Sequence, residues 1–180
     1  MDAELLDKLR FPIGKFHMPE IVSRELIDSY IADISVFPEL LKKEVAGLSD
    51  GQLDTTYRPE GWSIRQIVHH CADSHMNSFI RFKLALTEDS PTIKPYYEER
   101  WAELPDSNLK SLEPSLNILG GLHERWVVLL KSMDDDDLTK VFVHPEHGRR
   151  IPLLENLGIY AFHGRHHLAH ITELKKRKGW

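Results

Sequence analysis

Residues 61–86, GWSIRQIVHHCADSHMNSFIRFKLAL, decide the fold class because they carry the signature of a long amphipathic helix. Ser63 is followed three residues later by Gln66, the pattern of a capping box in which each side chain accepts a hydrogen bond from the other residue's backbone N–H. Apolar residues then recur at three- and four-residue spacing for about six turns. These residues are Ile64, Ile67, Val68, Cys71, Ala72, Phe79, Phe82 and Leu86. We predict a helix over residues 63–86.

Three further segments show the same helical spacing of apolar residues. They cover residues 23–47, 116–130 and 153–178. The first contains Pro38, which predicts a kink, and the last ends in four basic residues before Gly179, which suits a helix C-terminus. Four long helices predict an all-α four-helix bundle, with residues 1–180 forming a single domain.

The segments between the helices are predicted to be irregular. Residues 54–61 lack periodicity and read as a loop. Residues 87–112 hold three prolines among charged residues, which predicts a long crossover connection with a functional role. The acidic run 134–137 predicts a solvated turn, and residues 141–151 predict a short β-hairpin with Gly148 in its turn.

Composition and charge exclude several classes of protein. With 41% hydrophobic and 28% charged residues, the 180-residue chain is typical of a folded globular protein. A net charge of −5 gives no field that would attract nucleic acid or an anionic membrane surface. The apolar runs are too short to span a bilayer, the start of the chain is charged, and Cys71 has no partner for an internal disulfide. We therefore expect a cytoplasmic protein with neither nucleic acid nor membrane as a partner.

Histidine is concentrated in two short stretches of the predicted helices. Seven of the 11 histidines lie in residues 69–75 and 163–170. At 100° per residue, His163 and His167 lie one turn apart on the same edge of the core face. His170 and then His166 fall progressively further from that face. Shared direction and four-residue spacing make His163 and His167 candidate ligands of one metal ion.

The predicted helix over residues 63–86 offers two candidates for a third ligand. His75 is the more buried by projection, and His70 is the better placed for solvent access, so geometry leaves both open. His70 also begins a polar lane beside the apolar face, which continues with Ser74, Asn77 and Arg81. Such a lane is what one wall of a solvent-reachable pocket would present. Arg81 is either a salt-bridge residue at the bundle edge or a residue that binds a substrate carboxylate.

Two stretches resemble the DinB-like superfamily of four-helix metal proteins. They are GWSIRQIVHHCADSH (residues 61–75) and HGRHHLAHI (residues 163–171), and the resemblance extends over residues 11–180. Members of this family carry a three-histidine metal site with one ligand from the second helix and an H-x-x-x-H pair from the fourth. The resemblance implies His70, His163 and His167 as the ligands. Cys71 departs from the family pattern, which commonly has leucine after the ligand histidine.

Three imidazoles leave a divalent ion with an open coordination position, as in catalytic sites. Zinc suits these ligands, and nickel is an alternative. Water bound to such an ion becomes a nucleophile near neutral pH, so we predict one divalent metal per chain and a metal-dependent hydrolase acting on a small molecule. However, no Glu lies between His163 and His167 to serve as general base, and the chain has no G-x-S-x-G motif.

That absence favours a second interpretation, a metal-dependent thiol S-transferase. Several DinB-like proteins transfer bacillithiol, mycothiol or glutathione to an electrophile, and a metal stabilises the thiolate without a separate base. Arg81 would then bind a carboxylate of the thiol cofactor. A third interpretation is a non-catalytic bundle whose metal joins two helices; a cavity beside the imidazoles would count against it. We also expect a homodimer.

Overall fold

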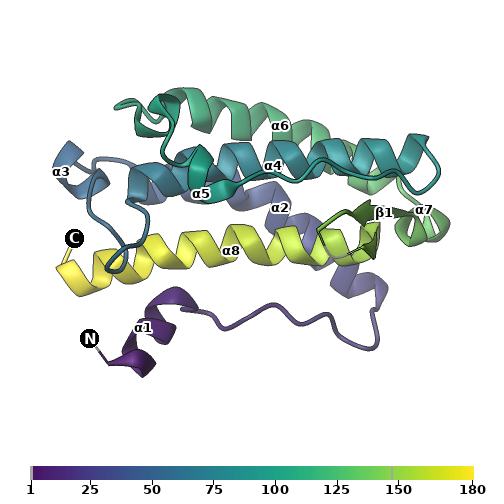
Figure 1. Ribbon diagram of the computed structural model, residues 1–180, viewed down its shortest axis with the longest axis horizontal. Coiled ribbons are helices and arrows are strands. Elements are labelled where there is room, and N and C mark those ends of the chain that lie inside the picture. Colours follow the sequence, from purple (N-terminus) through teal and green to yellow (C-terminus); the bar gives the residue numbers. More distant parts are fainter. Residues whose placement is uncertain (1, 147) are drawn as a thin grey trace.

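Across residues 2–146 and 148–180, which the computed structural model describes, four long helices lie side by side (Figure 1). They are α2 (Arg24–Val45), α4 (Ile64–Thr87), α6 (Glu113–Ser132) and α8 (Leu153–Lys178). Helices α2 and α4 each pack against both α6 and α8. The predicted all-α four-helix bundle is confirmed. None of the described helices is both long and apolar enough to cross a membrane.

Shorter elements precede or connect the long helices. They are α1 (Ala3–Arg10), α3 (Asp50–Leu53), α5 (Glu98–Trp101), the 3-10 helix η1 (Pro105–Asn108), α7 (Asp135–Thr139), β1 (Val141–His144) and β2 (Arg149–Pro152). The predicted hairpin is confirmed, because β1 and β2 pair in antiparallel fashion with Phe142 opposite Ile151. His147, in the predicted turn, lies outside the described residues.

Local signals fix the ends of the long helices. The capping box at the start of α4 is present, with the Ser63 Oγ accepting from the Gln66 N–H at 3.1 Å and the Gln66 Oε1 accepting from the Ser63 N–H at 3.0 Å. Helix α2 continues through Pro38. Helix α8 ends where Gly179 adopts a left-handed conformation with φ of 72°.

The prediction of a solvated turn at residues 134–137 was wrong, because this acidic run forms the start of α7. The Asp134 carboxylate caps that helix by accepting a hydrogen bond from the Asp137 N–H at 2.8 Å. Leu138 anchors the helix through its buried side chain. Helical spacing cannot be recognised in so short a segment.

Buried apolar side chains form two cores at opposite ends of the bundle. The hairpin-side core includes Ile31, Phe82, Trp126, Phe142 and Leu153. The C-terminal core includes Leu41, Ile67, Leu119, Ile171 and Leu174. Between them lies a histidine layer, which we define as His70, His75, His123, His163 and His167. A layer of buried polar groups therefore occupies the middle of the bundle.

Candidate metal centre

His70 of α4 and His163 and His167 of α8 meet in the histidine layer. One ring nitrogen from each lies within 4.8 Å of the other two. The Nε2 atoms of His70 and His163 are 3.3 Å apart. The four-residue spacing in α8 places His163 and His167 one turn apart on one face, as projected. The structure thus brings together the three histidines that the resemblance implied.

Burial keeps these three imidazoles neutral, which is the form that can bind a metal. Desolvation lowers the pKa of His70 to about 3 and holds the pKa values of His163 and His167 well below the usual 6.5. The Nδ1 of His167 is buried and has no hydrogen-bond partner among the described residues. Three neutral nitrogen donors, converging and incompletely paired, fit a divalent ion of the zinc or nickel type.

The cluster lines a cavity of about 820 Å³. The apolar part of the wall includes Trp62, whose ring lies 4.4 Å from that of His70. The charged part consists of Arg10, Arg58, Glu60, Glu98, Glu99 and Glu103. A cavity of this size accommodates a small molecule next to the three imidazoles.

Three acidic residues of the cavity come from the crossover connection. Gln66 anchors this segment, because its Nε2 donates a hydrogen bond to the Ala102 carbonyl at 2.9 Å. Glu98 and Glu99 lie in α5, and Glu103 follows it. Burial raises the pKa of Glu98, and the nearby Arg81 opposes that rise. The sequence analysis missed Glu98; its signal was an acidic pair within a long connection predicted to be functional.

Comparison with known proteins assigns this architecture to a family. A family model of the DinB superfamily matches residues 35–171, which include all three histidines of the cluster. The chain belongs to the DinB superfamily. The resemblance seen in the sequence is therefore confirmed.

Several known proteins are similar to this chain over 81% to 97% of its length. A Bacillus cereus (strain B4264) protein named "Putative metal-dependent hydrolase" is 54% identical over 175 residues, which cover 97% of this chain and 100% of that protein. YfiT from Bacillus subtilis, described as a probable metal-dependent hydrolase with an unusual four-helix bundle topology, matches with a TM-score of 0.93 and 47% identity, covering 96% of this chain and 99% of YfiT. A mycothiol-dependent maleylpyruvate isomerase matches with a TM-score of 0.63 over 81% of this chain and 60% of the isomerase, and its 15% identity shows the fold alone.

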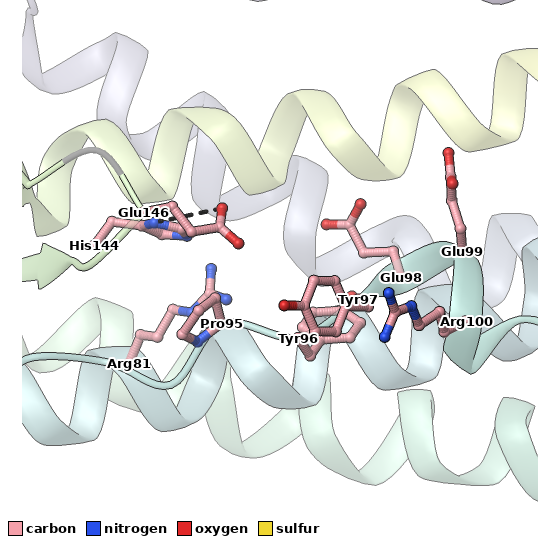
Figure 2. A pocket seen from close by; sticks show the side chains of 9 residues that line it. All are labelled: Arg81, Pro95, Tyr96, Tyr97, Glu98, Glu99, Arg100, His144 and Glu146. Atoms are coloured by element: carbon pink, nitrogen blue, oxygen red, sulfur yellow. Dashed lines mark ion pairs between the residues drawn. The ribbon is translucent and has the colours of Figure 1, made fainter.

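Arg81 of this DinB chain lines a different cavity from the three histidines. That neighbouring cavity, of about 430 Å³, lies between α4, the crossover and the end of the hairpin (Figure 2). Arg81 is 11 residues beyond His70, which corresponds to about 16 Å along the helix. Its guanidinium lies 6.0 Å from the centre of the Phe142 ring. The two cavities share Glu98 and Glu99, and binding of a thiol cofactor by Arg81 stays a prediction.

His170 differs from its projected position in the DinB bundle. Projection placed it further from the core than His167, yet only 3% of His170 is exposed. Tyr57 stacks on its ring at 3.9 Å, and its Nε2 donates to the Arg10 carbonyl at 3.1 Å. The loop before α4 and the end of α1 therefore cover this face. A helical projection predicts which residues face the bundle core, but it does not predict which other faces loops will bury.

The other singled-out residues of α4 have internal roles in the DinB fold. Ser74 is buried, and its Oγ lies 3.3 Å from the Tyr160 hydroxyl and 3.4 Å from the His163 Nε2. Asn77 donates a hydrogen bond to the Asp73 carbonyl of its own helix. Cys71 is fully buried in the C-terminal core, where desolvation raises the pKa of its thiol.

Proposed function

We propose that this protein is a metal-dependent hydrolase of a small molecule, with His70, His163 and His167 holding one divalent cation. The observation that carries the proposal is the convergence of three neutral imidazoles at a cavity of about 820 Å³. Structural metal sites are closed by protein ligands, whereas a catalytic site keeps an open position. The cavity also counts against a bundle in which the metal only joins two helices.

When bound, the cation lowers the pKa of a coordinated water toward neutrality. The chain's own residues supply the rest of the chemistry. Glu98 is the proposed proton acceptor, because its carboxylate lines the same cavity and burial raises its pKa toward the working range of a general base. The buried Ser74 hydroxyl lies 3.4 Å from the His163 Nε2 and 3.3 Å from the Tyr160 hydroxyl, so it helps to hold the His163 ring in place.

The test combines metal analysis with a substrate panel. The purified protein, loaded with zinc or nickel, is assayed against esters, amides and phosphoesters. We expect turnover of one class, its loss in His163→Ala, and a 10²- to 10⁴-fold fall in kcat in Glu98→Gln. Glu124→Gln is the matched control, since Glu124 lies on α6 beside another groove. Metal binding without hydrolysis of any class would contradict the proposal.

A thiol S-transferase is the second candidate, supported by the fold shared with the mycothiol-dependent isomerase and by two arginines at the cavity. Four glutamates line the same cavity, and this excess of acid disfavours a thiol that carries several carboxylates. Consumption of bacillithiol or glutathione in the presence of an alkyl halide or epoxide tests this candidate. Under it, Arg81→Ala weakens thiol binding by about 1 to 3 kcal/mol and leaves metal content unchanged.

Three finer properties of the protein can be measured directly: its metal, its oligomeric state and its location. We infer zinc as the metal, with nickel as the alternative, because imidazole suits both. The homodimer and the cytoplasmic location stay predictions. Elemental analysis of the protein as purified identifies the metal, light scattering measures the oligomeric state, and cell fractionation tests the location.

A further inference from the structure

Two buried histidines extend the metal cluster into a line that crosses the whole bundle. The His123 Nδ1 lies 2.6 Å from the Ile34 carbonyl oxygen, and the His123 Nε2 lies 2.8 Å from the His75 Nδ1. The His75 Nε2 then lies 3.0 Å from the His163 Nδ1. Ile34 belongs to α2, His123 to α6, His75 to α4 and His163 to α8. Each of the four long helices therefore contributes one member of the line.

We propose that His123 and His75 are positioning residues that fix the tautomer of His163, so that its Nε2 presents a lone pair to the metal cluster. This inference rests on the proposed metal site, but it concerns the protein's own hydrogen bonds and holds before any metal binds. It gives a role to two histidines that lie outside the candidate ligand set.

The direction of every hydrogen bond in the line follows from its first member. A carbonyl oxygen can only accept, so the His123 Nδ1 carries the hydrogen. A neutral imidazole has one N–H, so the His123 Nε2 accepts and the His75 Nδ1 donates. By the same rule the His75 Nε2 accepts from the His163 Nδ1. The hydrogen of His163 is then on Nδ1, and its Nε2 is left with a lone pair.

The surroundings keep the line neutral and rigid. His75 and His123 are 0% and 1% exposed. Removal of both rings from water favours the uncharged imidazole, which holds a single ring hydrogen. The Phe37 ring stacks 5.1 Å from the His75 ring, and Trp126 meets it edge-on at 5.9 Å. The rings are thus held in the orientation that the hydrogen bonds require.

The direction of the hydrogen bonds in the line decides whether the cluster can bind a metal. If His163 carried its hydrogen on Nε2, that hydrogen would point at the His70 Nε2, 3.3 Å away, and would block metal binding. Partners of ligand histidines commonly fix tautomer and ring orientation, and losing them weakens metal affinity 10- to 100-fold. In this chain the partner of His163 is another histidine, which is itself directed by His123.

The first test is the tautomer in the metal-free protein. Nitrogen NMR of histidine-labelled protein distinguishes a ring nitrogen that bears hydrogen from one that does not. We expect all three rings of the line to carry hydrogen on Nδ1 at neutral pH. A His163 ring protonated on Nε2, or an even mixture of tautomers, overturns the proposal. This measurement stands even if the wild-type protein binds no metal, which would overturn only the proposed metal site.

The second test compares two substitutions of His123. The amide of Gln can donate to the Ile34 carbonyl and accept from His75, so His123→Gln preserves the direction of the line. His123→Leu removes both bonds. We expect zinc affinity within about threefold of wild type for His123→Gln and 10- to 100-fold weaker for His123→Leu. Titration with zinc against a competing chelator measures both values.

His69→Leu is the matched control. His69 is also buried on α4 and hydrogen-bonded through both ring nitrogens, to Ser115 and the Leu109 carbonyl, but it lies outside the line. We expect it to reduce stability and keep zinc affinity. An equal loss of zinc affinity in His69→Leu and His123→Leu would show a general structural effect and overturn the proposal. If His123→Leu does not fold, the Gln variant and the NMR tautomer decide.

Discussion

The two apolar cores and the histidine layer between them are built by different rules. Side chains of the cores, such as Phe82 and Leu119, contribute through non-directional packing, so many combinations of similar volume would serve. The histidine layer depends on directional bonds at 2.6 to 3.0 Å, where one misplaced hydrogen changes the rest. The difference teaches that the cores stabilise the packed helices, whereas the hydrogen bonds of the layer form only when the helices are placed correctly relative to one another.

A buried polar layer is tolerated only where its groups are paired. In the line from Ile34 to the His163 Nδ1, each ring nitrogen has a partner. At the cluster the pairing is incomplete, as at the buried Nδ1 of His167. Within the layer, the line thus has its ring nitrogens paired, whereas the cluster keeps a ring with a nitrogen left unpaired.

Phe82→Ala should give the largest loss of stability without changing the metal site. Phe82 is fully buried in the hairpin-side core, and truncating such a ring costs about 3 to 5 kcal/mol. Urea unfolding of the metal-free protein measures this loss, and zinc affinity should stay within about threefold. Ile80→Ala is the control, because Ile80 is 53% exposed on the same helix. A parallel fall in zinc affinity would show that the cores and the layer are not separable.

His167→Ala should give the converse result. Structural sites with four ligands bind zinc with a free energy of about 10 to 16 kcal/mol, which is about 3 to 4 kcal/mol for each ligand. Loss of one ligand should therefore weaken zinc affinity roughly 10²- to 10³-fold. Unfolding of the metal-free protein should change far less than in Phe82→Ala. His166→Ala is the control, since His166 lines the cavity but is not in the cluster. Retention of metal by His167→Ala would remove it from the ligand set.

The sequence predicted which histidines of α8 converge better than it predicted their surroundings. His163 and His167 were found because helical periodicity fixes which residues share a face. His123 was missed because a single histidine in an apolar helix has no spacing signal. The position of Glu98 at the cavity depends on where the crossover folds back, and the burial of His170 depends on the segment around Tyr57. Helical periodicity encodes neither of these loop placements. Arg81 lines the neighbouring cavity, and its role toward a thiol cofactor stays a prediction.

Acidification should weaken the histidine layer more than the cores. The pKa of His123 is lowered from 6.5 to about 4, so the folded state stays neutral while the unfolded state takes up a proton below 6.5. The contribution of neutral, buried His123 to the free energy of unfolding is fully present above pH 6.5 and is lost as the pH falls toward 4. Between pH 7.5 and 5.5, His123 alone lowers the free energy of unfolding by about 1.4 kcal/mol. Metal-free wild type should therefore lose that much more stability than His123→Gln, as measured by urea unfolding at both pH values. Equal losses would mean that His123 is protonated in the fold.

Gly164→Ala should have the smallest effect, and its sign reports how tightly the layer is packed. Alanine in a helix interior is favoured over glycine by about 1 kcal/mol. At Gly164 a Cβ would lie 3.0 Å from the Phe37 ring, which is buried and stacked against His75. Phe37 cannot yield without disturbing that histidine, and overpacking costs about 1 to 3 kcal/mol. The net expectation is a destabilisation of about 1 kcal/mol.

Gly121→Ala is the control, because a Cβ there meets nothing within 4 Å, and it should stabilise the protein by up to about 1 kcal/mol. Thermal unfolding of both metal-free variants measures the difference. If both substitutions stabilise equally, Phe37 has room to move, and the layer is no more tightly specified than the cores on either side of it.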